Sequence, residues 1–435
     1  MSRYRTAGLV GCGTALIALT FLGLLFQLED RLDRFLVVAG LQSAIYAFAA
    51  WLAWNGGLAR GAVAGILALA IVMRVPVALA PPYLSADVYR YVWDGRVEAA
   101  GFNPYRHAPA DAELGALRDQ TIYPQIGSQH APTIYPPLAE AVFYVVSRVS
   151  GTVTAMKAAM VIFDLIAIVL LARLLAIEGL PTARVLIYAW HPLPVWEFAG
   201  SGHIDVVFIA CVLAALCAVK RLRPGLAGFF LAGATLTKFY PVILTPALYR
   251  RWDWKMPAVF IVTIAIAYVP FLSAGSRVLG FLPGYAGQEG FDASGAGFYV
   301  LELLRHLQWL GGLSTRSYEA MAVAVLAALS AVCVFRRDLD RPPYAMAAMS
   351  ATLFMVFVSP HYPWYFSWLI VFVCFARSFA LLWLTNACLL LYLISGYIFL
   401  PSAQRLAIET MIYGPFAILA LVDLWYDRRR VVSRS

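Results

Sequence analysis

One short stretch of the sequence carries more groups able to do chemistry than any other. Residues 87–96 read Asp-Val-Tyr-Arg-Tyr-Val-Trp-Asp-Gly-Arg, so two acids, two arginines and three aromatic rings lie within ten residues. They follow an apolar run, residues 61–80, that is long enough to cross a membrane. Asp87 is the first acid after that run, and we predict that it is a working carboxylate at the membrane surface. Asp94 lies on the same face if residues 87–98 form a helix, and it either has a second role or pairs with a neighbouring arginine.

Ionisable side chains also interrupt the apolar segments further along the chain, where a charged group is costly and functional by default. His191 precedes a proline, His203 and Asp205 belong to a Gly-His-Ile-Asp motif, Lys238 opens Lys-Phe-Tyr-Pro, and His361 lies between two prolines. A lysine within a span needs an anion, either a protein carboxylate or a bound phosphate. Structural roles stay open for the others, since His203 and Asp205 could pair at a helix start and His361 could mark a kink.

Two more acids lie within apolar segments. Glu197 follows a tryptophan, and Asp164 is the single acid of residues 157–177. A lone acid in a span needs a partner, so we expect Asp164 to pack against a neighbouring arginine or serine.

The composition indicates a membrane protein made of helices. Of the 435 residues, 62% are hydrophobic and 13% are charged, whereas soluble domains are roughly half apolar and about a quarter charged. The apolar runs are continuous rather than alternating, which favours helices over a barrel. We therefore predict an all-α polytopic membrane protein with a single membrane domain, residues 1–435. The net charge of +9 does not indicate nucleic-acid binding, because the basic residues cluster at the ends of spans.

The apolar pattern predicts about 12–14 transmembrane or re-entrant helices, at about 20 residues for each full crossing. Two long polar segments rich in Gly, Pro and aromatic residues interrupt them, residues 81–135 and residues 274–317. We predict that these are a first external catalytic loop and a second external loop. The predicted spans are residues 7–27, 34–54, 61–80, 136–150, 157–177, 184–199, 203–219, 225–249, 256–273, 318–335, 343–358, 364–377, 379–400 and 405–426.

Basic clusters predict the orientation of the chain, since cytoplasmic loops carry an excess of Lys and Arg. The clusters in residues 335–342 and in the tail, residues 427–435, are expected inside, which places both long loops outside. Two other apolar segments fit this orientation only if they turn back within the membrane at a break. These are residues 184–201, broken at Pro192 and Pro194, and residues 225–249, broken at Pro241.

Together these residues would place acids and cations on one outward-facing side of the protein. Cations in a largely apolar wall suit an anionic head group on a lipid tail. A carboxylate beside them suits general-base work on a hydroxyl. No Walker loop, Gly-x-Ser-x-Gly or His-Glu-x-x-His motif stands in a supporting context, so chemistry on soluble nucleotides is not expected.

Three islands of sequence resemble a known group of membrane enzymes. The first is residues 85–96, followed by Gly-Phe-Asn-Pro-Tyr at 101–105 and Thr-Ile-Tyr-Pro-Pro at 133–137. This island resembles the first external loop of membrane glycosyltransferases of the C superfamily. It is most similar to the bacterial mannosyltransferase-like branch, glycosyltransferase family 87 and its neighbours. The other islands are His-Pro with Gly-His-Ile-Asp and Lys-Phe-Tyr-Pro, where His191 and Ile204 replace the usual asparagines and leave the role of that stretch open.

The resemblance implies a C-type glycosyltransferase fold with helices in the external loops. It implies a polyprenyl-phosphate-linked sugar as donor, with mannose the leading sugar, and inversion at the anomeric carbon. Asp87 would then be the general base on the hydroxyl of a lipid or glycan acceptor. The residues assigned to the donor phosphate are Lys238, His203, His361, Arg90 and Arg96. Those assigned to the acceptor or to support of the site are Asp94, Tyr91, Trp93, Asp205, Tyr135 and His191.

Such a transfer requires no cofactor, because basic side chains can balance a single phosphate, although a divalent metal is compatible with it. The expected partners are the lipid-linked donor, the acceptor and membrane lipids, and the expected location is the bacterial inner membrane with the site facing the exterior.

The leading alternative is a transporter or flippase that moves a polyprenyl-linked sugar without chemistry. Inverted repeats would favour it, and none is visible. A membrane acyl- or phosphotransferase would instead need a nucleophile or catalytic histidine in a recognisable constellation.

Overall fold

The chain was analysed as a computed structural model, which describes residues 2–56, 61–308, 312–335, 343–394 and 402–432. Within these ranges all regular secondary structure is helical. The predicted all-α class of a polytopic membrane protein is therefore confirmed. Most of the predicted cytoplasmic loop at 335–342, the end of the predicted span 379–400 and the last residues of the tail lie outside the described residues.

Seven helices in the described part of the chain are long and apolar enough to cross a membrane. Three of the later ones bury few of their apolar side chains, with 11% of the most apolar window buried in residues 255–277 and 17% in two others. Their outward apolar faces suit a lipid surround. The seven are α1 (Ser2–Leu28), α2 (Leu32–Trp54), α3 (Ala62–Leu79), α6 (Val153–Ile177), α12 (Lys255–Tyr268) continued by η6 (Val269–Arg277), α15 (Thr315–Phe335) and α19 (Ser402–Val432).

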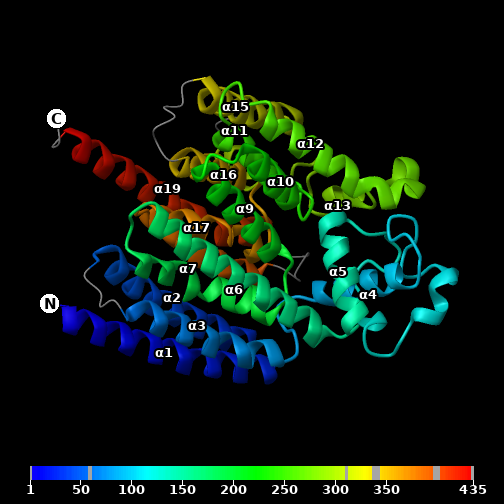
Figure 1. Cartoon of the computed structure of the whole chain (residues 1–435), viewed down its shortest axis with the longest axis horizontal. Helices are drawn as coiled ribbons and strands as arrows, with labels where there is room; N and C mark the ends of the chain where they lie inside the picture. Colours follow the sequence, from blue (N-terminus) through cyan, green and yellow to red (C-terminus); the bar gives the residue numbers. More distant parts are fainter. Residues whose placement is uncertain (1, 57–60, 309–311, 336–342, 395–401, 433–435) are drawn as a thin grey trace.

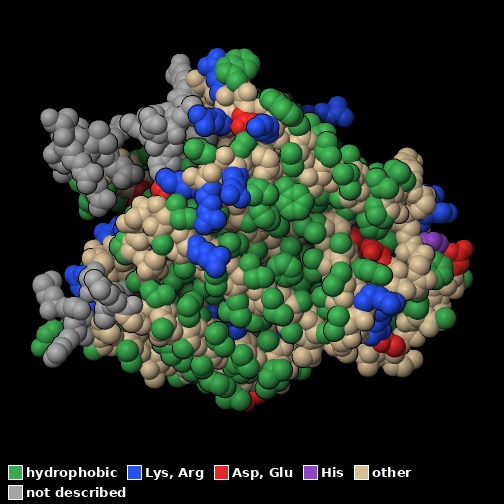
Figure 2. Space-filling view, viewed as in Figure 1, with side chains coloured by type: hydrophobic (Ala, Val, Ile, Leu, Met, Phe, Trp, Pro, Cys, Tyr) green, Lys and Arg blue, Asp and Glu red, His purple; other side chains and the backbone are tan. Residues whose placement is uncertain are grey.

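The two termini lie at one end of the molecule, and the loop helices α4 (Asp87–Ala99), α5 (Pro137–Val149) and α13 (Leu282–Gln288) lie at the other (Figure 1). A wide area of hydrophobic side chains lies between charged side chains toward the two ends (Figure 2). This is the surface that a bilayer requires of a polytopic protein. Other helices outside the two broken segments are η1 (Ala112–Leu117), η2 (Tyr123–Gln125), α14 (Tyr299–His306), α16 (Tyr344–Val358), η7 (Pro363–Phe366), α17 (Leu369–Val373), α18 (Phe379–Ala387) and η8 (Cys388–Leu393).

The first of the two predicted broken segments is interrupted directly before Pro192. Proline has no N–H and crowds the preceding turn, so the helix ends at Ala189 and His191 takes an extended backbone. The predicted break is therefore confirmed at Pro192, whereas Pro194 lies inside the next short helix and makes no second break. The pieces are η3 (Thr182–Val185), α7 (Leu186–Ala189), α8 (Pro192–Pro194) and the wider π-type turn η4 (Val195–Gly200).

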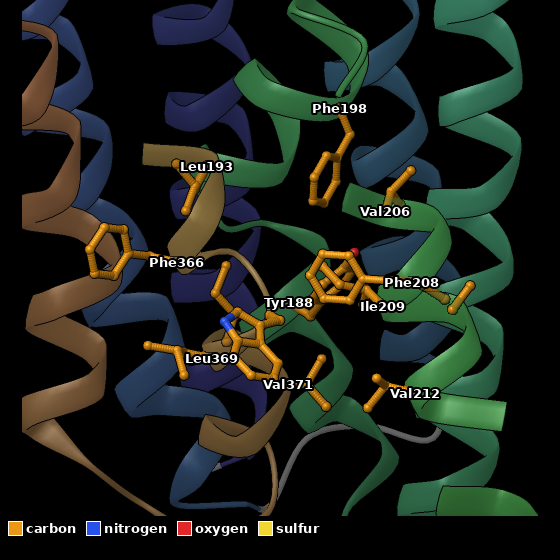
Figure 3. Packing of buried hydrophobic residues seen from close by; sticks show 14 of the residues in the cluster. Tyr188, Leu193, Phe198, Val206, Phe208, Ile209, Val212, Phe366, Leu369 and Val371 are labelled. Atoms are coloured by element: carbon orange, nitrogen blue, oxygen red, sulfur yellow. The ribbon is translucent and has the colours of Figure 1, made fainter. Parts of the chain in front are cut away.

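This broken segment forms the centre of the hydrophobic core. Its side chains from residue 185 to residue 200 are all buried. Leu193 and Phe198 belong to the same cluster of buried hydrophobic residues as Phe208 of α9 (Asp205–Lys220) and Leu369 of α17 (Figure 3). Non-helical backbone is tolerated at membrane depth where protein surrounds it, and here the protein does so completely.

The second predicted break lies slightly before the predicted position. The chain leaves α10 (Pro224–Thr235) and is irregular at Thr237 and Lys238, before η5 (Tyr240–Leu244) and α11 (Thr245–Leu248) follow. Pro241, the predicted break point, instead occupies the first turn of η5, where its missing N–H costs no hydrogen bond. Lys238 therefore lies in the break itself.

A fully buried ion pair joins the long helices to the broken segment. The side chains of Arg74 and Asp164 form this pair with no exposed surface, which confirms the expected partner of Asp164. Arg74 also donates to the carbonyl of Ala189 at 2.7 Å, and the Tyr188 hydroxyl donates to Asp164 at 2.8 Å. The pair therefore fixes α7 against α3 and α6.

We expect Arg74→Met to lower the free energy of unfolding by about 3–5 kcal/mol, because it leaves a buried carboxylate without its counter-charge. Unfolding in detergent, followed by circular dichroism, measures the loss. The matched control is Arg31→Met, since Arg31 and Asp33 form a pair whose side chains are 41% and 67% exposed, and it should leave the midpoint unchanged. Equal stability of the two variants would contradict the assigned role.

Candidate active site

Asp87 begins helix α4 at the point where the chain turns back after α3. Pro81 and Pro82 follow the end of α3, so the chain runs in a non-helical linker until α4 starts. A carboxylate in the first turn of a helix is stabilised by the unpaired N–H groups there. The Asp87 side chain is 40% exposed, and none of the described residues donates a hydrogen bond to its carboxylate. The start of α4 therefore fixes the position of Asp87, while its carboxylate oxygens accept no hydrogen bond from the described residues.

Helix α4 owes its position to a close contact with α5. Gly95 lies so near the carbonyl oxygen of Phe143 that an added Cβ would come within 2.2 Å of it. Tyr91 stacks flat on the Phe143 ring, with ring centroids 4.5 Å apart. Glycine at the crossing lets the two helices approach, and the buried face of α4 then turns Asp87 toward the later helices.

Two cavities meet at Asp87. The first, which we call the lysine cavity, has a volume of about 520 Å³ and is lined by Asp87, Lys238, Tyr240, Trp364 and Tyr365. The second, which we call the arginine cavity, has a volume of about 730 Å³. Its polar lining is Arg90, Ser128, Gln288, Glu289, His361 and Arg405. Asp87, Tyr135, Tyr285 and Tyr362 line both cavities, so the carboxylate lies at their junction.

The cation of the lysine cavity is held in position by protein groups. Lys238 Nζ lies 2.9 Å from Asp205 Oδ2 and 4.3 Å from the centre of the Tyr365 ring. The Tyr240 hydroxyl donates to the other Asp205 oxygen at 3.1 Å. Asp205 is fully buried, whereas 12% of the Lys238 side chain remains exposed to the cavity. The ammonium group can therefore meet a bound anion without moving far.

The surroundings of Asp87 tune its acidity. Water reaches the carboxylate through the cavities, but protein encloses it on the other sides. This burial is the main reason that the pKa of the Asp87 carboxyl is raised to about 6. The positive charge of Lys238 lowers this pKa, whereas the negative charges of Asp205 and Glu289 raise it further. A carboxylate with this pKa is ionised at neutral pH and is a better proton acceptor than an ordinary aspartate.

The arginine cavity carries paired charges. Arg90 Nε lies 2.8 Å from both Asp94 oxygens, and its Nη1 donates to the Ala131 carbonyl at 3.0 Å. His361 Nδ1 lies 3.2 Å from Glu289 Oε2. These groups offer hydrogen-bond donors and acceptors with little net charge.

The two predicted loops form this cavity together. The Phe281 N–H donates to the Thr133 carbonyl at 3.1 Å, and the Asn103 side-chain amide donates at 2.8 Å to Ser273 Oγ, directly before the second predicted loop. Phe281 of the second loop and Ile134 of the first both line the arginine cavity. The second loop therefore completes a site that begins in the first.

Comparison with protein families decides the class of the protein. Residues 6–253 match the alpha-(1->6)-mannopyranosyltransferase, N-terminal domain, of the MptA/B family. The chain belongs to this family. No curated protein and no solved structure matches the chain. As a member of the MptA/B family, the protein is a membrane glycosyltransferase of the mannosyltransferase type.

The family match covers the part of the chain that supplies most of the candidate site. Asp87, Arg90, Tyr135, Asp205 and Lys238 all lie within residues 6–253. The match thus confirms the class that the first loop resembles, a mannosyltransferase-like membrane glycosyltransferase.

Some of the predicted site residues lie away from the cavities of this MptA/B family member. Arg96 Nη1 lies 2.6 Å from Asp119 Oδ2, and Arg96 Nη2 donates to the Gly151 carbonyl at 2.6 Å. His191 Nε2 lies 3.0 Å from the Thr385 hydroxyl, deep in the core. Trp93 packs on the far side of α4, where its ring lies 5.5 Å from that of Tyr123.

Other predicted residues support the cavity wall from behind. Asp94 holds Arg90, Tyr91 packs edge-on to Tyr135 at a ring distance of 5.1 Å, and Asp205 holds Lys238. His203 is fully buried behind Asp87, with Nδ1 3.7 Å from Asp87 Oδ2. Within the described residues no group of three or more His, Cys, Asp and Glu side chains is arranged to hold a metal ion.

Among the residues of the arginine cavity that were not predicted are Arg405 and Tyr285. Arg405, at the start of a predicted span, resembles an ordinary interfacial arginine in the sequence, but here it lines the cavity and pairs with Glu302 at 2.5 Å. Tyr285 lines both cavities and shares a hydrogen bond with the Tyr365 hydroxyl at 3.2 Å. Neither position carries a local signal, since the contacts join distant parts of the chain.

Proposed function

We propose that the protein transfers mannose from a polyprenyl-phosphate-linked donor to a hydroxyl group of a lipid or glycan acceptor. In this proposal Asp87 is the general base, the transfer is a single displacement with inversion, and the site faces the exterior. The observation that carries the proposal is the position of Asp87 at the junction of the two cavities, with a cation on one side. A base at that point can reach an acceptor hydroxyl in one cavity while the donor phosphate occupies the other.

The lysine cavity suits the donor phosphate. Lys238 supplies a positive charge for the departing phosphate, and a phosphate leaves readily enough that no general acid is needed. Aromatic rings of Tyr240, Trp364 and Tyr365 make the rest of the wall suitable for the apolar start of a prenyl chain and for stacking on a sugar.

The arginine cavity suits the acceptor. Its charged side chains are held in pairs that present both hydrogen-bond donors and acceptors, which suits a molecule rich in hydroxyl groups. Arg90, Gln288 and Glu289 offer both donors and acceptors for such hydroxyl groups. The acceptor hydroxyl nearest the junction of the two cavities would lose its proton to Asp87. At the same time the hydroxyl oxygen would attack the anomeric carbon of the donor sugar.

The distribution of basic residues supports an external site. Helix α9 begins at Asp205 beside the site and ends at Lys220, and its 16 residues span about 24 Å. The basic cluster at 220–223 therefore lies far from Asp87, and the C-terminus also lies at the opposite end of the molecule from α4 (Figure 1). Because basic clusters favour the cytoplasmic side, the site is assigned to the other side.

Donor choice and topology test the proposal together. Purified protein in vesicles is given mannose linked either to polyprenyl phosphate or to a nucleoside diphosphate, with a lipid extract as acceptor. We expect product from the lipid-linked donor alone. A cysteine introduced at Ser85 should react with an impermeant reagent from outside intact cells. Product from the nucleotide donor, or labelling from the cytosolic side, would contradict the proposal, and movement of the donor across the vesicle without product would indicate a flippase.

The acidity of Asp87 predicts the pH dependence. A base must be ionised, so activity is lost as the pH falls through the raised pKa of Asp87, about 6. We expect kcat/KM to rise about tenfold between pH 5 and pH 7 and then level off, as for a single base with that pKa. Initial rates in a constant-ionic-strength buffer series measure this profile. A limb centred near pH 4 would show that Asp87 behaves as an ordinary exposed carboxyl.

A further inference from the structure

The space behind Asp87 is filled by a histidine that no cavity exposes. His203 is fully buried, and its ring lies flat on Trp364, with ring centroids 3.9 Å apart and an angle of 21° between the planes. Its Nδ1 faces Asp87 Oδ2 at 3.7 Å and the Tyr91 hydroxyl at 3.5 Å. The stacking fixes the ring plane, so both nitrogens keep constant directions.

A second carboxylate meets the other side of the same ring. Glu197 is fully buried, and its Oε2 lies 3.4 Å from His203 Nε2. Neither atom has another hydrogen-bond partner among the described residues. The Tyr392 hydroxyl donates to the remaining oxygen of Glu197. Since a buried polar atom left unpaired costs about 1–3 kcal/mol, a proton shared between these two atoms is the arrangement that satisfies both.

The backbone fixes this geometry. The His203 N–H donates to the Glu197 carbonyl at 2.9 Å across the π-type turn η4. Gly202, with φ of +75°, makes the reversal, and an added Cβ there would come 3.0 Å from the Lys157 side chain and 3.1 Å from that of Val88. The wide turn and the glycine thus hold His203 between Glu197 and Asp87.

We propose that Asp87, His203 and Glu197 form a buried proton path that accepts the proton of the acceptor hydroxyl. The acceptor O–H bond breaks and the proton binds Asp87 Oδ2. That proton then moves to His203 Nδ1 while the proton on Nε2 moves to Glu197 Oε2. Asp87 is a carboxylate again, His203 is neutral in its other tautomer, and Glu197 is protonated. The steps reverse to release the proton to water after the product leaves.

The path gives His203 and Glu197 the role of positioning residues that act through Asp87. Lys238 keeps its own partner Asp205, so its charge need not be neutralised by the base. The inference depends on the proposed function, because it needs Asp87 to take a proton. It adds two residues, His203 and Glu197, that line neither cavity themselves.

The test compares Glu197→Gln with wild type in single turnovers of donor-loaded protein, in mixtures of water and deuterium oxide. The amide keeps the volume but cannot take up a proton. We expect a rate loss of about tenfold to a hundredfold, within the range that proton transfer contributes. The wild-type rate should depend on the deuterium fraction along a curve, as for several moving protons, and the variant rate should follow a straight line. His203→Gln should give the same loss, and the double variant should be no slower than either single one.

The matched control is Glu178→Gln. Glu178 also accepts a phenol hydrogen bond, from Tyr344 at 2.8 Å, but it pairs with Lys220 far from the site. This control should keep the wild-type rate and curve. If Glu197→Gln and His203→Gln both keep the wild-type rate and its curved dependence on the deuterium fraction, the proton path is wrong. Full transfer by Asp87→Asn would instead overturn the proposed function itself, so the two failures are distinguishable. If Glu197→Gln does not fold, His203→Gln decides alone by the same readout.

Discussion

Asp87→Asn is expected to abolish most of the transfer while the protein still binds its donor. Asparagine keeps the size of the side chain but removes the proton acceptor, and general-base catalysis contributes about 10²–10⁴-fold to a rate. We therefore expect kcat to fall by about 10²–10⁴-fold and the KM for the lipid-linked donor to change little. Steady-state kinetics with radiolabelled donor measure both constants.

A matched control separates the loss of the base from the loss of a charge in the same loop. Glu113, in η1, is 67% exposed and lines neither cavity, so Glu113→Gln should keep the wild-type rate. A normal rate for Asp87→Asn would show that another group takes the proton. A large rise in donor KM with unchanged kcat would show that Asp87 binds the donor rather than acting as a base.

Lys238→Met is expected to weaken donor binding. A hydrogen bond to a charged group contributes about 1.5–3 kcal/mol, which corresponds to about tenfold to a hundredfold in the KM for the donor. The variant also leaves Asp205 buried without its partner, which lowers stability. Unfolding in detergent and donor kinetics should therefore both change.

The double variant Lys238→Met/Asp205→Asn separates these two effects. Removing both charges should restore much of the stability, because no uncompensated charge remains. It should not restore the donor KM, because the cation of the lysine cavity is still absent. Recovery of both properties would show that Lys238 stabilises the fold and has no role in phosphate binding.

The candidate site was predictable where the signal is local. Asp87 follows an apolar run directly, and Lys238 interrupts another, so each is conspicuous against its surroundings. Helix geometry could also have separated the two arginines. Arg90, three residues after Asp87, shares its face, whereas Arg96, nine residues after it, lies about 180° around a helix at about 100° per residue. The structure places Arg90 in the arginine cavity and Arg96 against Asp119.

The parts that could not be predicted depend on contacts between distant segments. His361 meets Glu289 because the second loop packs against the chain between Pro360 and Pro363, and Arg405 reaches the same cavity from the start of α19. The role of His203 changes for the same reason, since in the fold it lies behind Asp87 and against Glu197 rather than in the cavity. Spacing in the sequence carries no information about which carboxylates the His203 ring meets in the fold.

A structure of the Asp87→Asn variant with bound polyprenyl-phosphate mannose tests the central claim most directly. The account predicts the phosphate in the lysine cavity, within about 4 Å of Lys238 Nζ, the distance at which two charges interact strongly. It also predicts the anomeric carbon of the sugar beside the substituted side chain at position 87, open toward the arginine cavity. A phosphate bound elsewhere, or a sugar turned away from position 87, would contradict it.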